Sequence, residues 1–279
     1  MAAVFNNFQE DTNAFINPGD LTKEISGFPQ ICISTFSENI INHFIETNEA
    51  RIIAHLYSSN GAIPVYAVKY ADMTFGLFLS RVGAPACVAG LEEIIALGAK
   101  GIVLFGCCGV LNQSVVQNKI IIPLSAVRDE GTSYHYIPSS EEISADSSSV
   151  NLTTRCLEQH GIPYVAGKVW TTDAIYRETT GLIEERKKQG CIAVDMECSA
   201  SLAVSKFRNV PVIPFLFGAD HLDSDRWEPR DLDVYKRQVI AVPCKGVSHI
   251  RYLIPNILHF VNLLCLILTR VYCTKRYIT

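Results

Sequence analysis

The chain has 279 residues, 48% of them apolar, which is enough to bury the core of one large α/β domain. Its formal charge of −4 and its pI near 6.0 exclude the basic surface that nucleic-acid binding needs, so we expect a small-molecule partner. Ten cysteines are scattered with no C-x-x-C pair, and residues 1–27 lack the basic and apolar regions of an export signal. We therefore expect no disulfide scaffold and a cytoplasmic, reducing location.

The first hundred residues predict a strand, a helix, a hairpin and a second helix. Ile40, Ile41 and Phe44 recur at helical spacing, and Gly98 is typical of a residue that ends a helix. The expected elements are an irregular arm over 1–27, a strand over 30–34, a helix over 38–48, strands over 65–70 and 75–79, and a helix over 84–97.

The next segment, Gly101–Gly109, is a continuous apolar run that ends in a turn with two glycines, Gly106 and Gly109. A run without alternation predicts a strand covered on both faces, as in a parallel or mixed sheet flanked by helices. Two interpretations of the glycines stay open at this point. They let backbone N–H groups approach a ligand at the carboxyl end of the strand, or they serve a tight turn that needs left-handed backbone.

The second half of the chain continues with strands and helices. Two of its loops, 128–136 and 170–177, combine charged and aromatic residues after a strand, as functional loops commonly do. The expected elements are a strand over 119–123, a serine-rich acidic loop over 139–150, a helix over 152–160, a strand over 164–171, a charged helix over 181–189, a helix that runs to 207, and a strand over 212–218.

Two carboxylates, Asp195 and Glu197, stand inside the otherwise apolar run Ile192–Ala200. Carboxylates seldom enter such surroundings without partners. A glutamate held there can accept two hydroxyl hydrogens at once, which suits the vicinal diol of a ribose. The alternative is an acid near a turn that points to solvent, and this stretch alone does not decide between them.

A set of motifs in consistent order and spacing resembles the purine nucleoside phosphorylase and uridine phosphorylase family over residues 30–230. The motifs are Val82-Gly83-Ala84-Pro85 before a helix, Gly106-Cys107-Cys108-Gly109 after a strand, Arg128 with Asp129 and Gly131, Thr172-Asp173 with Tyr176, Val194-Asp195-Met196-Glu197, and Asp220-His221.

The resemblance implies an α/β fold of three layers, α/β/α, around a central mixed and partly barrel-like sheet. It also implies a homo-oligomer, a dimer or a trimer of dimers, in which each site borrows residues from a neighbour. The reaction implied is reversible phosphorolysis of a ribonucleoside to free base and ribose 1-phosphate, with inorganic phosphate as co-substrate and no cofactor. No metal is implied, and the seven histidines show no ligand spacing.

The same resemblance assigns roles to individual side chains. Met196 packs under the sugar and Glu197 binds its hydroxyls. Ile175 and Tyr176 pack against the base, and Asp220 contacts the base and protonates the leaving nitrogen, which requires a pKa raised by burial. The alternative for Asp220 is a turn or capping acid after a strand. The glutamine and arginine that bind uracil in the uridine branch find no match in residues 176–180, and Asp220 favours purines, so the resemblance implies a purine base.

The phosphate site departs from the family pattern. The Gly-Asp-Pro loop and its arginine are replaced by Ser34-Thr35-Phe36-Ser37-Glu38, and the second arginine by Leu104. Loss of both arginines removes charge-assisted, bidentate contacts to a dianion. The phosphate candidates that remain are Gly83, Gly106, Cys107 and Arg128, with Arg81 as a further possible cation. Two alternatives therefore stay open: a nucleosidase that uses water, and a nucleoside-binding or storage protein without turnover.

The C-terminal segment changes character after the family-like region. We expect an N-terminal arm over 1–27, a nucleoside phosphorylase-like domain over 28–232, and a non-native tail over 233–279. Residues 233–238 resemble the translation of a transposase adapter from sequencing libraries. The apolar run Tyr252–Leu268 is too short and interrupted for a clear membrane span, so a helix packed on the sheet is the preferred interpretation of a genuine tail.

Overall fold

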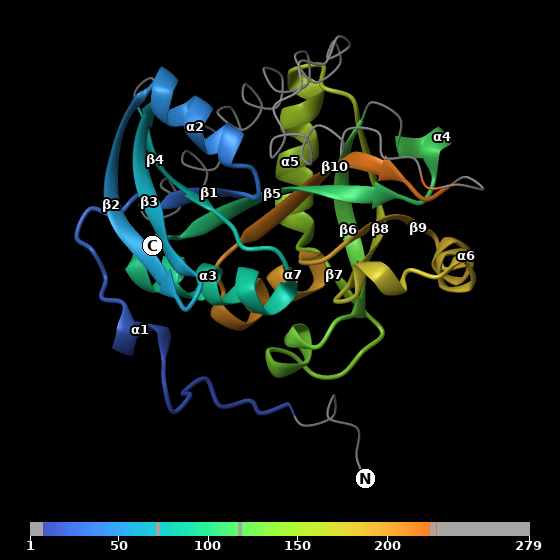
Figure 1. Cartoon of the computed structure of the whole chain (residues 1–279), viewed down its shortest axis with the longest axis horizontal. Coiled ribbons are helices and arrows are strands. Elements are labelled where there is room, and N and C mark those ends of the chain that lie inside the picture. The colour runs from blue at the N-terminus through green and yellow to red at the C-terminus, as the bar shows by residue number, and fades with distance from the viewer. Residues whose placement is uncertain (1–7, 71–72, 117–118, 224–226, 228–279) are drawn as a thin grey trace.

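The computed structural model describes residues 8–70, 73–116, 119–223 and 227 (Figure 1). The strands are β1 (Ile31–Thr35), β2 (Glu49–Ser58), β3 (Gly61–Tyr70), β4 (Met73–Leu79), β5 (Gly101–Val110), β6 (Ile120–Asp129), β7 (Glu142–Ser144), β8 (Tyr164–Thr172), β9 (Cys191–Asp195) and β10 (Val212–His221). The helices are α1 (Pro18–Leu21), α2 (Glu38–Thr47), α3 (Ala84–Leu97), α4 (Gln113–Val116), α5 (Ser147–Gln159), α6 (Thr180–Lys188), α7 (Cys198–Arg208) and two 3₁₀ turns, η2 (Thr132–His135) and η3 (Ile175–Arg177).

All ten strands belong to one mixed sheet with the order β10-β6-β8-β9-β5-β1-β4-β3-β2, and β7 pairs with β6. Because β10 also pairs with β5, the strands β5, β10, β6, β8 and β9 close into a ring. The strands β1, β4, β3 and β2 extend from this ring as an open sheet. The expected partly barrel-like sheet is therefore confirmed.

Strand β5 is the centre of the sheet, because it pairs with β1 and β10 in parallel and with β9 in antiparallel orientation. Its apolar run lies between partner strands and helices, so nearly every side chain is buried. Phe105 of β5 stacks with Phe215 and Phe217 of β10 at ring-centroid distances of 4.7 and 5.2 Å. These contacts fix the position of β10, whose carboxyl end carries Asp220.

Helices cover both faces of the sheet and give the three layers (Figure 1). On one face, α2 and α5 bury Ile41, Phe44 and Leu157 in a core that includes Phe105 and Phe215. On the other face, α3 and α7 contribute side chains to a second core with β1 and β5. The expected α/β/α architecture is confirmed.

Several element boundaries differ from the sequence-based expectation. Strand β2 was not predicted, and β6 continues past Pro123 to Asp129, so that part of the polar segment 128–136 is a strand. Helix α5 begins at Ser147, after Asp146 caps it by accepting the Ser149 N–H at 2.8 Å. The expected non-native tail, 233–279, lies outside the described residues. Within the described part of the chain, no helix is long and apolar enough to span a bilayer.

Candidate functional site

A cavity of about 180 Å³ lies where the carboxyl ends of β5, β9 and β10 meet the amino end of α7. Open α/β sheets place ligand sites at such strand ends. Its lining comes from six parts of the chain that are far apart in sequence: Phe36, Val82, Cys107, Cys108, Gly109, Ile175, Glu178, Val194, Asp195, Met196, Glu197, Ala219, Asp220 and Leu222.

Glu197 occupies the N-cap position of α7 and is only 7% exposed. Its Oε1 accepts a hydrogen bond from the backbone N–H of Gly83 at 2.6 Å. Gly83 is itself the N-cap of α3 and has a φ of 95°, a conformation that favours glycine. The amino ends of α3 and α7 therefore meet at this carboxylate.

Asp195, at the end of β9, is buried beside Glu197. Its Oδ1 accepts from the Thr171 hydroxyl at 2.7 Å, and its Oδ2 accepts from the N–H groups of Glu197 at 3.2 Å and Cys198 at 2.6 Å. Burial raises the pKa of Asp195 above its ordinary value, against the lowering effect of these bonds. Burial and the neighbouring Asp195 charge likewise raise the pKa of Glu197.

Asp220 reaches the cavity from β10, at the register position opposite Gly109 of β5. Its Oδ2 accepts a hydrogen bond from the Trp227 indole N–H at 2.8 Å. An alanine at Gly109 would place its Cβ 2.4 Å from the Leu222 side chain and 3.4 Å from Asp220 Oδ1. The absence of a side chain at Gly109 therefore makes room for the side chains of Asp220 and Leu222.

A buried chain of hydrogen bonds supports the loop after β6. Ser199 donates to Glu130 at 2.8 Å, Glu130 accepts the Ser133 N–H at 2.9 Å, and the Arg128 Nε donates to the Ser133 hydroxyl at 2.8 Å. The Arg128 guanidinium also donates to the Pro138 carbonyl and the Ser140 hydroxyl, both at 2.8 Å. These hydrogen bonds therefore link the polar residues of the loop to one another and, through Ser199, to the first turn of α7.

Among the residues given a role in the site from the sequence, five line the one cavity, namely Met196, Glu197, Asp220, Ile175 and Cys107. They come from β5, η3, β10 and the β9–α7 connection. The order of motifs in the sequence therefore corresponds to a single place in the fold.

The other candidates do not line it. Tyr176 is 95% exposed, and Gly106 is buried, with the Phe36 ring 3.2 Å from where a Cβ would stand. Gly83 acts through its N–H on Glu197. The Arg128 guanidinium bonds within its own loop, and its role as a phosphate-binding cation stays a prediction.

The charge of the cavity is one-sided. Four carboxyl groups line it, those of Glu178, Asp195, Glu197 and Asp220, whereas no lysine, arginine or histidine does among the residues that the structure describes. Two of these acids, Glu178 and Asp195, had no assigned role from the sequence. Asp195 was visible within the acidic motif, whereas the approach of Glu178 to Asp220 arises only from the tertiary fold.

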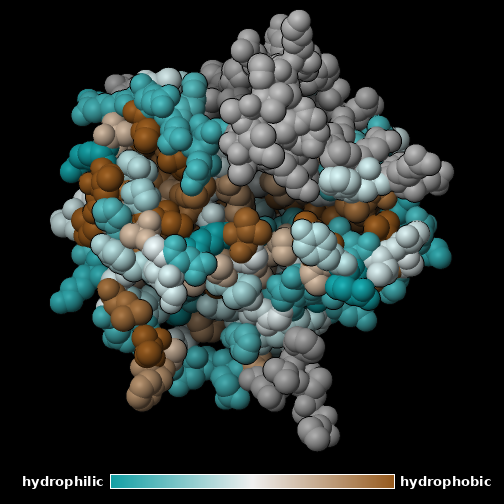
Figure 2. Space-filling view, viewed as in Figure 1, coloured by the Kyte–Doolittle hydropathy of each residue, from teal (hydrophilic) through white to brown (hydrophobic). Residues whose placement is uncertain are grey.

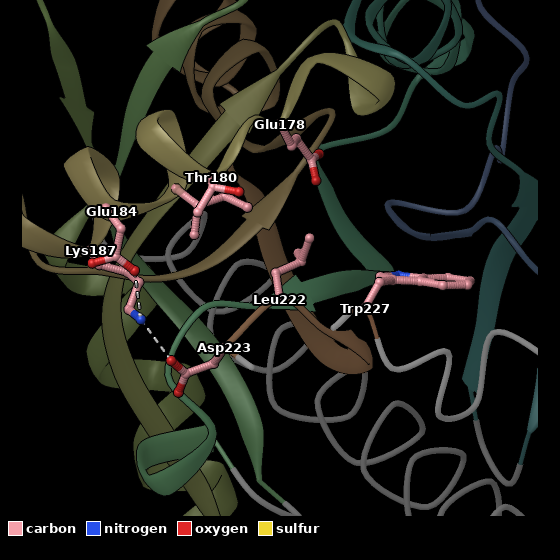
Figure 3. Close-up of a pocket in the computed structure, with 8 residues that line it drawn as sticks. Glu178, Thr180, Glu184, Lys187, Leu222, Asp223 and Trp227 are labelled. Atoms are coloured by element: carbon pink, nitrogen blue, oxygen red, sulfur yellow. Dashed lines mark hydrogen bonds and ion pairs between the residues drawn. The ribbon is translucent and has the colours of Figure 1, made fainter. Parts of the chain in front are cut away.

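A second cavity of about 490 Å³ adjoins the first, and Glu178 and Leu222 line both (Figure 3). Lys187 of α6 bonds to Asp223 at 2.7 Å and to Glu184 at 3.2 Å along its wall. In the described residues, no group of three or more His, Cys, Asp or Glu side chains is placed to hold a metal ion.

Comparison with known proteins connects this architecture to one family. The family model described as "Phosphorylase superfamily" matches residues 30–242. An uncharacterized protein of Acanthamoeba polyphaga mimivirus is 28% identical over 193 residues, 69% of this chain and 72% of the viral protein. A DeoD-type purine nucleoside phosphorylase of Aliivibrio salmonicida is 24% identical over 159 residues, 56% of this chain and 67% of that enzyme.

Solved structures show the same fold at low sequence identity. Purine nucleoside phosphorylase from Toxoplasma gondii, in complex with immucillin-H, superposes with a TM-score of 0.70 at 19% identity over 88% of this chain and 94% of that one. Uridine phosphorylase from Vibrio fischeri gives a TM-score of 0.64 at 21% identity over 81% of this chain and 91% of that one.

The partly closed mixed sheet, with an acid-lined cavity at its strand ends, defines an α/β protein of the nucleoside phosphorylase type. Because the family model matches most of its length, the chain belongs to the phosphorylase superfamily.

Proposed function

We propose that this protein cleaves the N-glycosidic bond of a purine ribonucleoside by reversible phosphorolysis, giving free base and ribose 1-phosphate. The observation that carries the proposal is that Glu197 and Asp220, which come from different elements, line one cavity together with Met196. Family membership supports the reaction type, and relatives of the purine branch support the base.

The chemistry follows from the positions of the two acids. Cleavage of a glycosidic bond develops positive charge on the ribosyl carbon, and carboxylates nearby stabilise it. Glu197, fixed by the Gly83 N–H, binds the sugar hydroxyls above Met196. Asp220 supplies a proton to the departing base nitrogen, and Trp227 holds its other oxygen. No metal or organic cofactor has a role in this scheme; phosphate is the second substrate.

The acid-only lining favours a second candidate, hydrolysis of the same bond by water. A phosphate dianion is normally held by arginine or lysine, and no such side chain lines the cavity in the described part of the chain. Phosphorolysis therefore calls for cationic groups beyond those that line this cavity, and a neighbouring subunit of the proposed homo-oligomer is one source of them. Water needs no such group.

One experiment decides between the reactions. The purified protein is incubated with inosine, with and without millimolar phosphate, and the sugar product is identified. Strict phosphate dependence with ribose 1-phosphate as product supports the proposal. Free ribose at equal rates in both samples establishes the hydrolase instead, and binding of inosine without any product identifies a nucleoside-binding protein. Asp220→Asn is the control that must lose turnover in either enzymatic case.

A further inference from the structure

The first turn of α7 is capped by residues other than its own N-cap. An N-cap side chain ordinarily accepts the N–H of the second or third helical residue. Glu197 stands at the N-cap position, but its Oε1 accepts the Gly83 N–H instead and its side chain lines the cavity. The N–H groups at the start of a buried helix still need acceptors. In α7 these acceptors come from two neighbouring strands.

Asp195 of β9 and Thr171 of β8 supply the acceptors. Asp195 Oδ2 accepts the Cys198 N–H at 2.6 Å, and the Thr171 hydroxyl oxygen accepts the Ser199 N–H at 3.0 Å. The Thr171 hydroxyl also donates to Asp195 Oδ1 at 2.7 Å, across the paired strands β8 and β9. One hydroxyl therefore binds the residue two positions before Glu197 and the residue two positions after it.

Thr171 acts on the cavity only through these bonds. It is fully buried, and the described residues that line the cavity do not include it. Valine has nearly the same shape but no hydroxyl, so Thr171→Val would leave the buried Ser199 N–H without its acceptor. Glu197 holds the position from which a side chain accepts such an N–H. A Glu197 carboxylate that caps its own helix is withdrawn from the cavity.

We propose that Thr171 is a positioning residue that caps α7 in place of Glu197 and so keeps the Glu197 carboxylate available for the sugar hydroxyls. The proposal rests on the proposed function, since that function assigns the sugar to Glu197. Groups that bind a reacting substrate must be held close to their productive geometry. Loss of the Thr171 hydroxyl should therefore lower kcat/KM although Thr171 touches no substrate.

The test is a double-mutant cycle on kcat/KM for inosine with phosphate present, measured below the Tm of every variant. Because misplacement of a binding group costs up to about 100-fold, Thr171→Val should lower kcat/KM ~10–100-fold when Glu197 is present. In a Glu197→Ala background the same change should have little effect, because no carboxylate is left to misplace. Thr171→Ser keeps the hydroxyl and should retain most of the activity.

Thr153→Val is the matched control for loss of a buried hydroxyl. Thr153 is equally buried, and its hydroxyl donates to the Ser149 carbonyl at 2.8 Å within α5. Thr153→Val should lower the Tm and leave kcat/KM unchanged. If Thr171→Val does not fold, Thr171→Cys takes its place in the cycle, since a thiol is only a weak donor and acceptor.

An equal fall of kcat/KM in both backgrounds, or no fall in either, overturns the proposal, as does a loss in Thr171→Ser as large as in Thr171→Val. If the wild type forms no sugar product, the proposed function fails, and the same cycle on the calorimetric Kd of inosine decides this inference. Binding that Thr171→Val weakens only when Glu197 is present supports it. Equal affinities in all variants, or no binding by the wild type, reject it.

Discussion

Glu197 illustrates how a single residue can serve the site at a cost to folding. It is 7% exposed, accepts the Gly83 N–H, and lies beside buried Asp195. Burial and the Asp195 charge raise its pKa, so ionisation of Glu197 opposes folding. Hydroxyl donors from a bound ribose would favour the ionised form, because hydrogen bonds to a carboxylate lower its pKa.

Glu197→Gln should therefore lower activity and raise stability. Because the loss of a charged hydrogen-bond acceptor costs about 1.5–3 kcal/mol, kcat/KM should fall ~10–100-fold. A carboxyl whose pKa rises on folding stabilises below its unfolded pKa, and this contribution is lost as pH rises through the folded-state value. Glutamine avoids that loss, so thermal denaturation at about pH 8 should show a higher Tm than wild type, with the gap narrowing toward about pH 4.

The same pH series can also contradict the predicted gain in stability. If Glu197→Gln melts below wild type at every pH, the carboxylate is stabilised by the fold and the raised pKa is refuted. A matched control is Glu184→Gln, an exposed acid of α6, for which the pH dependence of the Tm should follow wild type.

Asp195→Asn tests the neighbouring acid, which has a structural role. Its two oxygens accept hydrogen bonds from one hydroxyl and two backbone N–H groups. In Asp195→Asn the amide nitrogen replaces one of these oxygens. It then either faces the two N–H donors or removes the acceptor of the Thr171 hydroxyl. An unsatisfied buried group costs about 1–3 kcal/mol, and we expect the free energy of unfolding in urea to fall by that amount. Asp223→Asn, at the partly exposed ion pair with Lys187, should cost less, about 1 kcal/mol.

At the scale of elements, the site depends on two helix starts and two strand ends that meet. Gly83 begins α3 and Glu197 begins α7, and the two helices also join near the end of α7, where Arg208 bonds bidentately to buried Glu92 at 2.7 and 3.0 Å. This contact holds α7 against α3, and Glu197, as the N-cap of α7, is held beside the start of α3 as a result.

The contact of β1 with β4 provides a prediction for the sheet. Gly76 of β4 faces Cys32 of β1, and an alanine Cβ would lie 2.4 Å from the Cys32 Sγ but 3.4 Å from its Cβ. Overpacking of this kind costs about 1–3 kcal/mol, so Gly76→Ala should lower the free energy of unfolding by that amount. In a Cys32→Ala background the cost of Gly76→Ala should shrink, because the sulfur is gone.

Gly19→Ala is the control for this cycle, since no atom lies within 4 Å of its Cβ position. If the costs of Gly76→Ala and Cys32→Ala are additive, the predicted steric clash between an alanine at position 76 and the Cys32 sulfur is contradicted.

Elements with a strong local signal were predicted correctly, and those set by tertiary contacts were not. The unbroken apolar run of β5 correctly predicted a buried strand. Strand β2 is mostly exposed at the edge of the sheet and lacks such a pattern. The expected strand ended at Pro123, but β6 passes this proline by a register shift between Pro123 and Ser125.

The site shows the same division. Motif order indicated Glu197 and Asp220, because each stands directly beside an element end. The role of Arg128 inside its own loop and the approach of Glu178 to Asp220 depend on contacts across the fold, which a linear motif does not encode.

At the scale of the whole molecule, apolar side chains remain exposed around the mouth of the cavity. Val82 is 67% and Ile175 51% exposed although both line the cavity, and Tyr176 is 95% exposed beside them. Another apolar area lies over β2 and β3, where Ile52 is 53% exposed (Figure 2). Exposed apolar surface next to a polar site is typical of interaction surfaces.

We therefore expect a second copy of the chain to cover the cavity mouth, and Tyr176→Asp tests this. A charge placed in an apolar contact between subunits loses its hydration without a partner, so it weakens assembly. Sedimentation should show a homo-oligomer for wild type and a smaller species for Tyr176→Asp, with activity falling in parallel because each site loses its neighbour. Phe15→Asp changes an equally exposed aromatic on the N-terminal arm and should leave the mass unaltered. A wild type that sediments as a monomer with full activity would show instead that one chain completes the site, and the acid-only cavity would then favour water over phosphate.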